Sequence, residues 1–258
     1  MTMQRTENQI ERFRQLVSRR KALGYLVAAG AAVMLPGRGS HAEARQLGSD
    51  ASCQLINSET GGPFEADGSN GPNVLTSPAV FRSDIRSNLD GSNVQPGVAF
   101  ILKMSVVDVS NNCAPMVGAA IYLWHCNADG AYSAYAGMGQ NDQAGNTFLR
   151  GVQVTDPNGQ VTFTTIYPGR YPGRATHFHA RIYRDEGFNT TLRTTQFAFD
   201  DAKTSKVYAS SSAYKDSKAA RETTNDEDWL FRDGFLGQLL ELSGDPASGY
   251  EGSIVVGV

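Results

Sequence analysis

Short β-rich runs, each bounded by turn residues, follow one another along the chain from residue 98 onward. Runs of β-branched and aromatic residues are typical of strands, and their regular spacing is typical of an antiparallel β-sandwich. Helical patterning is weak and is confined to residues 213–222 and 229–242. We therefore predict a mainly β protein, with an antiparallel β-sandwich over residues 96–258 and few short helices. The predicted strands are residues 98–109, 119–125, 152–155, 161–164, 176–183, 194–199 and 253–256.

One predicted turn indicates which two strands pair. Asp156-Pro157-Asn158-Gly159 separates the β-rich runs 152–155 and 161–164. Pro, Asn and Gly favour tight turns, and two short strands on either side of such a turn usually pair as a hairpin. We expect these two strands to be neighbours in one sheet.

Residues 1–95 lack this strand pattern and divide into two parts. Residues 45–95 are rich in Ser, Asn, Gly and Asp, which predicts an irregular lead-in that wraps the core. Residues 1–44 have the pattern of an export signal: Arg19-Arg20 precede an uncharged run at 22–35, and small-residue cleavage sites follow at 40–44. The adjacent arginines are typical of the twin-arginine route, so we expect a periplasmic or extracellular protein. The alternatives are a membrane anchor or a buried helix, although the fourteen-residue run is shorter than the about 20 residues that span a bilayer.

Composition and charge narrow the classes of partner. The 258 residues are 40% apolar and 19% charged, an ordinary globular composition with a net charge of −3. Residues 1–44 contain seven Lys or Arg and three Asp or Glu, so their removal leaves a net charge of −7. An acidic surface without basic runs argues against nucleic acid as a partner. We expect no membrane span in the mature chain, and the sequence leaves the oligomeric state open.

Three cysteines, Cys53, Cys113 and Cys126, remain after the predicted signal. In an oxidising compartment we expect one disulfide and one cysteine left over. Cys113 and Cys126 flank a short apolar run and would meet if the chain doubled back, so this pair is our prediction. The alternative is three buried thiols.

The clearest candidates for chemistry are His177 and His179. In a strand, residues two apart point to the same face, and Phe178 between them belongs to the apolar face. Two imidazoles side by side on a rigid strand form a natural pair of metal ligands, although a polar strand face would also explain them. Besides His41 in the predicted signal, the only other histidine is His125. A metal site must therefore use all three remaining histidines or recruit another residue type.

Tyr132 and Tyr171 are the other candidates, because each follows turn residues where we expect the rim of the sandwich. A phenol with a pKa near 10 ionises at neutral pH only beside a strong cation such as Fe(III). Taken singly, either tyrosine is equally explained as a packed aromatic residue with a hydrogen-bonded hydroxyl.

Several motifs together resemble the intradiol ring-cleavage dioxygenases. Residues 118–133 read GAAIYLWHCNADGAYS and resemble the first signature of that family. The second signature is matched by FLRGVQVTD at 148–156, TIYPGRY at 165–171 and RATHFH at 174–179. RSDIR at 82–86 and TTQ at 194–196 also fit. The likeness extends from about Cys53 to the C-terminus and is greatest to the exported, single-domain members of the family.

This resemblance implies a function and a set of site residues. It implies one non-haem Fe(III) with Tyr132, Tyr171, His177 and His179 as ligands. It implies that a catechol is cleaved by O2 between its two hydroxylated carbons, giving a muconate-type dicarboxylic acid. Tyr171 would also accept a substrate proton, Arg174 would stabilise developing negative charge, and Gln196 would lie near the substrate.

The sequence departs from the family in its lead-in and leaves alternatives open. Where the family often has Thr-Glu-Gly-Pro-Tyr, residues 60–64 read TGGPF. One alternative is a zinc hydrolase or hydratase with a three-histidine site made by His125, His177 and His179. Another is a non-catalytic exported β-sandwich that binds a carbohydrate or a protein. The sequence does not identify the catechol: Arg150, Arg170 and Arg174 would favour a carboxylated ring, but they would equally satisfy loop carbonyls.

Overall fold

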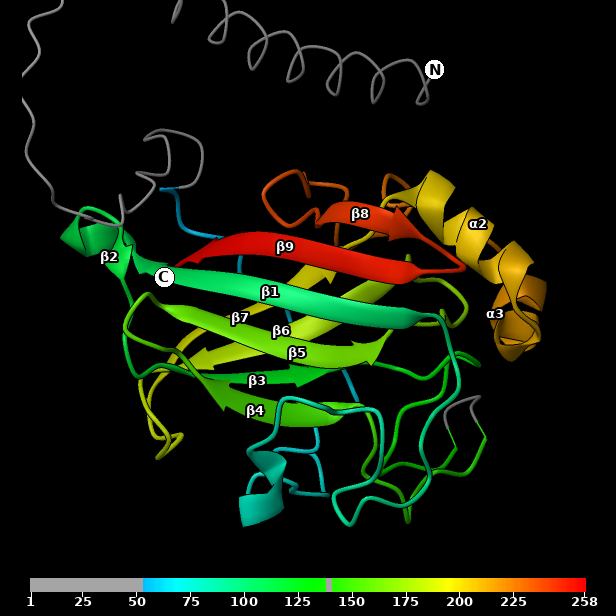
Figure 1. The fold of residues 1–258 in the computed structure, drawn as a ribbon, viewed down its shortest axis with the longest axis horizontal. Coiled ribbons are helices and arrows are strands. Elements are labelled where there is room, and N and C mark those ends of the chain that lie inside the picture. Colours follow the sequence, from blue (N-terminus) through cyan, green and yellow to red (C-terminus); the bar gives the residue numbers. More distant parts are fainter. Residues whose placement is uncertain (1–52, 138–140) are drawn as a thin grey trace, which may run out of the picture. The chain divides into compact units, whose positions relative to one another are not determined.

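Two β-sheets pack face to face and enclose the main hydrophobic core (Figure 1). The computed structural model describes residues 53–137 and 141–258, so the predicted export signal at 1–44 lies outside the described residues. In these ranges nine strands form the two sheets, which confirms the predicted mainly β sandwich. Two short helices, α2 (Asp201–Ser210) and α3 (Lys215–Ala219), lie at one end of the sandwich. No helix of the described ranges has both the length and the apolar character needed to cross a membrane.

The first sheet is built around β1 (Ala99–Asp108). Its side chains alternate between solvent and the core, and Phe100, Leu102 and Met104 are almost fully buried. β9 (Gly249–Gly257) pairs with β1 in parallel, which is the exception in an otherwise antiparallel sandwich. The other strands of this sheet are β2 (Ala114–Pro115) and β5 (Gln160–Ile166), which pair with β1, and β8 (Glu241–Asp245), which pairs with β9.

The second sheet carries the candidate site and is antiparallel throughout. Its strand order is β4 (Arg150–Val154), β3 (Ala120–Trp124), β6 (His177–Tyr183) and β7 (Thr191–Ala198). Every residue of β3 is buried, because one face of the sheet packs on the first sheet and the other lies beneath the lead-in. The outward residues of these strands are therefore covered by the lead-in and not by solvent, and they are available for an internal site.

The lead-in covers the outer face of this second sheet. Residues 53–98 contain one short 3₁₀ helix, η1 (Pro78–Val80), and otherwise attach to the sandwich through isolated bridges such as Phe81 with Val152. Arg181 on β6 forms ion pairs with Glu65 and Asp67 of the lead-in. Phe64, Val74 and Val80 pack against Tyr122 and Trp124 of β3 in a second apolar cluster.

The predicted hairpin over residues 152–164 is wrong. The turn forms, with the Asp156 carboxylate accepting from the backbone N–H groups of Asn158 and Gln160. The strands on either side nevertheless belong to different sheets, because β4 pairs with β3 and β5 pairs with β1 over its whole length. The turn is therefore a corner between the two layers.

The predicted helices are only partly correct. Residues 213–222 overlap the 3₁₀ helix η3 (Ser212–Tyr214) and α3, whereas residues 229–242 form turns that lead into β8. α2 was not predicted, although the Asp200 side chain caps its N-terminus by accepting from the Lys203 N–H. Its weakly amphipathic sequence buries only Thr204, Val207 and Tyr208, which explains why its periodicity gave no signal.

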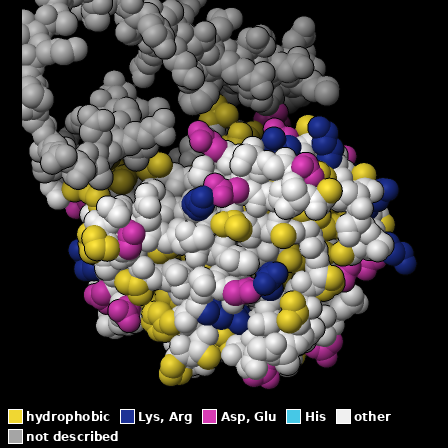
Figure 2. All heavy atoms as spheres, viewed as in Figure 1, with side chains coloured by type: hydrophobic (Ala, Val, Ile, Leu, Met, Phe, Trp, Pro, Cys, Tyr) yellow, Lys and Arg dark blue, Asp and Glu magenta, His cyan; other side chains and the backbone are white. Residues whose placement is uncertain are grey.

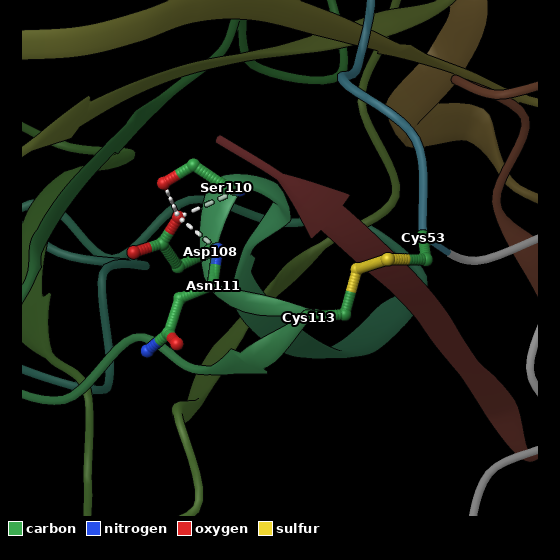
Figure 3. Close-up of a disulfide and its surroundings, with 5 residues drawn as sticks. All are labelled: Cys53, Asp108, Ser110, Asn111 and Cys113. Atoms are coloured by element: carbon green, nitrogen blue, oxygen red, sulfur yellow. Dashed lines mark hydrogen bonds between the residues drawn. A yellow bond between two sulfur atoms is a disulfide. The ribbon is translucent and has the colours of Figure 1, made fainter.

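The disulfide joins Cys53 to Cys113, and the predicted pair of Cys113 with Cys126 is wrong (Figure 3). The chain does not double back after Cys113; it runs on through β3, and Cys126 is a buried free thiol beyond the end of that strand. Cys113 lies shortly after the 3₁₀ helix η2 (Val109–Asn111). Asp108 is the N-cap of this helix, and its side chain accepts from the backbone N–H groups of Ser110 and Asn111. The disulfide therefore ties the start of the lead-in to the first sheet.

Figure 2 shows one face of the molecule, on which acidic and basic side chains are interspersed. Lys103 on β1 and Glu251 on β9 illustrate the pattern, since they form an exposed ion pair at 2.8 Å. Among the described residues visible there, basic side chains do not gather into a single large patch.

Candidate metal centre

β6 supplies two imidazoles on the outer face of the second sheet. Phe178 and Ala180 of this strand point into the main core, so His177 and His179 point together toward the lead-in, as the alternation predicts. Both histidines are almost completely buried, and their Nε2 atoms lie 3.1 Å apart. Trp124, the neighbour of His179 on β3, stacks on its ring with the centroids 4.9 Å apart.

Tyr132 reaches the same point from the loop that follows β3. The Asn127 side chain accepts from the N–H groups of Asp129 and Ala131 and so holds the loop in a tight turn. A side chain at Gly130 would collide with the Arg170 carbonyl, so the close approach of the two loops requires glycine there. The Tyr132 hydroxyl lies 3.2 Å from His179 Nε2 and 3.4 Å from His177 Nε2.

Tyr171 approaches from the second of these loops. Its ring lies against the rings of Tyr132 and His177, each at a centroid distance of 5.8 Å, and its hydroxyl is hydrogen-bonded to that of Tyr132. The structure thus brings Tyr132, Tyr171, His177 and His179 into one cluster with their oxygen and nitrogen atoms converging. We call these four side chains the donor cluster.

Burial controls the protonation of the donor cluster. It lowers the pKa of both imidazoles well below the usual value, and Arg174 adds to the effect. It raises the pKa of the Tyr132 phenol well above 10, and that of Tyr171 in the same direction. At neutral pH the imidazoles are therefore neutral and hold free lone pairs, while the phenols ionise only beside a strongly charged cation.

His177 is oriented as metal-binding histidines usually are. His177 Nδ1 lies 2.6 Å from the Ala175 carbonyl and must donate to it, so Nε2 carries the lone pair. His179 Nδ1 is buried without a hydrogen-bond partner among the described residues, and its Nε2 faces the cluster. The donor cluster presents two neutral nitrogens and two ionisable oxygens at one point. This set of donor atoms fits a hard trivalent cation.

Arg174 lies beside the donor cluster and is held by a buried network. One guanidinium nitrogen lies 3.4 Å from the Tyr171 hydroxyl and 3.5 Å from His177 Nε2. Another donates to the Gln196 side chain at 2.6 Å, and Nε forms an ion pair with Asp228 at 2.9 Å. Gln196 in turn donates to the Thr60 carbonyl of the lead-in. Arg174 and Gln196 were predicted to lie near the site, but Asp228 was not, because no motif marks it.

The lead-in forms the outer wall of the donor cluster. Phe64 stacks on Tyr132 with the centroids 4.6 Å apart and meets the edge of Tyr171 at 6.3 Å. Gly62 packs so closely that a Cβ atom there would lie 3.4 Å from His179 Cε1. The departure from the family motif at residues 60–64 is visible in the sequence, but the contact of this segment with the donor cluster is not.

His125 does not belong to the donor cluster. It follows Trp124 and therefore points to the opposite face, where its ring contacts Phe178 in the main core. Its Nδ1 lies 2.8 Å from the Cys126 carbonyl and its Nε2 lies 2.7 Å from the Thr165 hydroxyl, so both nitrogens are engaged. Within the described ranges no group of three His, Cys, Asp or Glu side chains could hold a metal. The geometry thus contradicts the three-histidine zinc alternative.

A cavity of about 510 Å³ lies on the solvent side of the cluster. Phe64 and Tyr171 form its inner wall, and Asp129, Arg170 and Asp216 also line it. Tyr171 is partly exposed, whereas Tyr132, His177 and His179 are almost fully buried. Tyr171 therefore separates the cavity from the other three donors.

Fold and site together define a β-sandwich protein with a buried histidine–tyrosine cluster on one sheet and an adjoining cavity. The family model described as "Dioxygenase" matches residues 70–199, just over half of the chain. This chain belongs to the intradiol ring-cleavage dioxygenase family. Family and fold support ring cleavage of catechol-like substrates.

Solved structures agree with this family. An intradiol ring-cleavage dioxygenase from Tetranychus urticae is 26% identical, with a TM-score of 0.64, and the match covers 80% of this chain and 94% of that one. A second dioxygenase structure is 28% identical, with the same TM-score and coverage. The dioxygenase domain of a carbohydrate-binding fusion protein from Streptomyces sp. SirexAA-E shares the fold, with 24% identity and a TM-score of 0.52. This match covers 80% of this chain and 98% of that one. The comparison with curated proteins gives no match.

Proposed function

We propose that this protein uses one non-haem Fe(III) and O2 to cleave a catechol between its two hydroxylated carbons, giving a muconate-type dicarboxylic acid. Tyr132, Tyr171, His177 and His179 would hold the iron. The observation that carries the proposal is the convergence of two imidazole nitrogens and two phenol oxygens, with His177 Nε2, His179 Nε2 and the Tyr132 hydroxyl within 3.4 Å of one another.

The chemistry of these donors supports a ferric ion. Neutral imidazole binds several transition metals, but two phenol oxygens select for a hard, highly charged one. When bound, Fe(III) would act as a Lewis acid that favours the deprotonated catechol and lends its ring the radical or carbanion character that reacts with O2.

The remaining steps fall to this chain's own groups. Tyr171 lines the cavity and its oxygen lies beside Arg174, so as a phenolate in the iron-loaded protein it would be placed to take a proton from an incoming catechol hydroxyl and become the neutral phenol. The Arg174 guanidinium would then stabilise negative charge on the substrate oxygens, an effect commonly worth about 3 kcal/mol. Asp228 and Gln196 hold that guanidinium in place, and Phe64 keeps bulk water from Tyr132.

Iron analysis combined with oxygen uptake tests the proposal. Purified protein should contain one iron per chain and should show visible absorption from charge transfer between phenolate and Fe(III). Addition of catechol should consume one O2 per catechol and yield a ring-opened dicarboxylic acid. His179→Ala should lose iron, colour and oxygen uptake together. Stoichiometric zinc, or a colourless protein with full iron content, would contradict the proposal.

We also propose that the protein is exported by the twin-arginine route. The motif Arg19-Arg20 supports this, and a disulfide between Cys53 and Cys113 is expected of a protein in an oxidising compartment. Replacement of both arginines by lysine should retain the protein in the cytoplasmic fraction. Unchanged export of that variant would rule out this route.

A further inference from the structure

The cavity beside Tyr171 is the feature that bears on which catechol is used. Its inner wall is apolar and aromatic, formed by Phe64, Tyr171 and Pro172. Its charged lining residues are Asp129, Arg170 and Asp216, contributed by the loop after β3, the loop before β6, and α3. A ring whose hydroxyls face the donor cluster would direct a substituent at its far side into this cavity.

The arginine of this cavity is already occupied. Arg170 is only 8% exposed and donates to the carbonyls of Ser217 at 3.0 Å and Ala220 at 3.2 Å. It also lies 3.7 Å from the Glu222 carboxylate. Its guanidinium therefore serves to fix α3 and the segment after it, and its charge is partly neutralised before any ligand arrives.

The other two arginines near the site are also engaged. Arg150 is fully buried and donates to the Ser133 hydroxyl and carbonyl, and Arg174 is paired with Asp228. None of the three arginines that could recognise a carboxylated ring presents a free guanidinium to the cavity.

The two aspartates, by contrast, are open to the cavity. Both are exposed, and among the described residues neither carboxylate has a basic partner. Both line the same cavity; burial raises the pKa of Asp129, and the negative charge of Asp216 raises it further. No lysine is among the described residues that line the cavity.

We propose that Asp129 and Asp216 make this cavity select catechols whose ring substituent is uncharged or cationic and reject catechols that carry a carboxylate. This inference rests on the proposed ring-cleaving function. A carboxylate entering the cavity would meet two negative charges and no free cation, and it would lose hydration without gaining a partner. An aminoethyl group would gain two partners, and a methyl group would contact Phe64 and Pro172.

The experiment compares catalytic efficiencies in iron-loaded protein. We expect kcat/KM to be higher for 4-methylcatechol and for dopamine than for 3,4-dihydroxybenzoate. In the double variant Asp129→Asn/Asp216→Asn, kcat/KM for 3,4-dihydroxybenzoate relative to kcat/KM for 4-methylcatechol should rise about tenfold. The kcat/KM for dopamine relative to that for 4-methylcatechol should fall by a similar factor. Both changes should shrink at high salt. Glu186→Gln, an exposed acid at the opposite end of β6 from His177, should leave every ratio unchanged.

A binding measurement separates failure of this inference from failure of the proposed function. Tyramine and 4-hydroxyphenylacetate carry one phenol, so neither is a catechol, and calorimetry reports their affinity without turnover. We expect tyramine to bind more tightly than 4-hydroxyphenylacetate. In the double variant this difference in affinity should be smaller. If no catechol is cleaved but this difference appears, the proposed function fails and the charge selection stands. If catechols are cleaved and the carboxylated one is equal to or better than the others, the charge selection is overturned and the function stands.

Discussion

Three members of the donor cluster are each held by a contact that does not involve the nitrogen or oxygen atom that would face the proposed Fe(III). The Ala175 carbonyl takes the Nδ1 proton of His177, Trp124 stacks on His179, and Phe64 stacks on Tyr132. These contacts restrict ring rotation before a cation arrives, so less conformational entropy is lost on binding. The cluster is therefore preorganised for the proposed Fe(III) by neighbours that would not themselves touch it.

Asp228 is expected to act on catalysis through Arg174. In Asp228→Asn the buried guanidinium loses its charged partner, although the amide oxygen can still accept from the Ala175 N–H. We expect kcat for catechol to fall about tenfold, since a misplaced charge stabiliser costs more than 1 kcal/mol, while iron content and the visible band stay unchanged. Steady-state oxygen uptake and absorption spectra at a temperature where both proteins are folded provide the measurement.

Asp233→Asn is the matched control, because Asp233 is an exposed aspartate five residues further along the same segment. It should change neither kcat nor colour. Loss of iron from Asp228→Asn would assign Asp228 to the integrity of the donor cluster instead of the placement of Arg174.

We expect His125 to affect the stability of the fold at acid pH and to have no part in metal binding. Burial lowers the pKa of His125 to about 3 in the folded protein. The unfolded chain binds this proton below about pH 6.5, so the stability from neutral His125 is complete above pH 6.5 and is lost as the pH falls toward 3. The loss from this one group approaches about 1.4 kcal/mol per pH unit.

His125→Gln removes the titration while keeping a group that can bond to Thr165. Urea unfolding between pH 7 and pH 4 should show a shallower loss of stability in the variant than in the wild type, with equal iron content in both. A variant that loses its metal would revive a three-histidine site.

At the scale of elements, the lead-in acts as a wall and not merely as a linker. Phe64→Ala should remove the stacking partner of Tyr132 and open a void, costing about 3 kcal/mol of stability. Because water then reaches the phenol oxygens, we expect iron to be released to a chelator about tenfold faster. Chelator kinetics followed at the visible band measure this rate.

Phe81→Ala is the matched control for Phe64→Ala. Phe81 lies in the same lead-in and stacks on Phe188, but it is 39% exposed and lies outside the donor cluster. The Phe81→Ala substitution should lower the free energy of unfolding by about 1 kcal/mol or less and leave the rate of iron release unchanged. Equal acceleration in both variants would mean that the lead-in acts only through global stability.

The elements that the sequence predicted well are those whose burial pattern is local. β1 alternates between exposed and buried residues, and the β6 sequence alternates between polar and apolar residues, so both strands and the common direction of His177 and His179 could be predicted. The turn at 156–159 was also predicted, but not that β4 and β5 separate into different sheets. Turn residues determine a local bend, whereas strand partners depend on contacts far away in the chain.

The residues of the candidate site also divide into those that a local sequence pattern identifies and those that depend on contacts between distant parts of the chain. Four donors and Arg174 were found because they lie in motifs that the sequence displays, whereas Asp228 and Phe64 reach the cluster over sequence separations of 54 and 68 residues. The cysteine pairing failed for a similar reason. Proximity in sequence favoured Cys126, but the bond closes a loop of sixty residues to Cys53.

That loop contains the described lead-in, so the disulfide bears on the stability of the whole fold. Cross-linking residues sixty apart reduces the entropy of the unfolded chain, and such bonds typically contribute about 2–4 kcal/mol. Cys53→Ser/Cys113→Ser should therefore lower stability by this amount. The folded variant should keep its colour and iron, because Arg181 still pairs with Glu65 and Asp67 and Phe81 still bridges to Val152.

Urea unfolding of the wild type with and without reductant, beside the double variant, tests both parts. Reductant should bring the wild type down to the stability of the variant and should not affect the variant itself, since its one remaining cysteine, Cys126, is buried and unpaired. A variant that folds but cannot retain iron would show that the disulfide, and not the ion pairs of Arg181, holds the lead-in against the donor cluster.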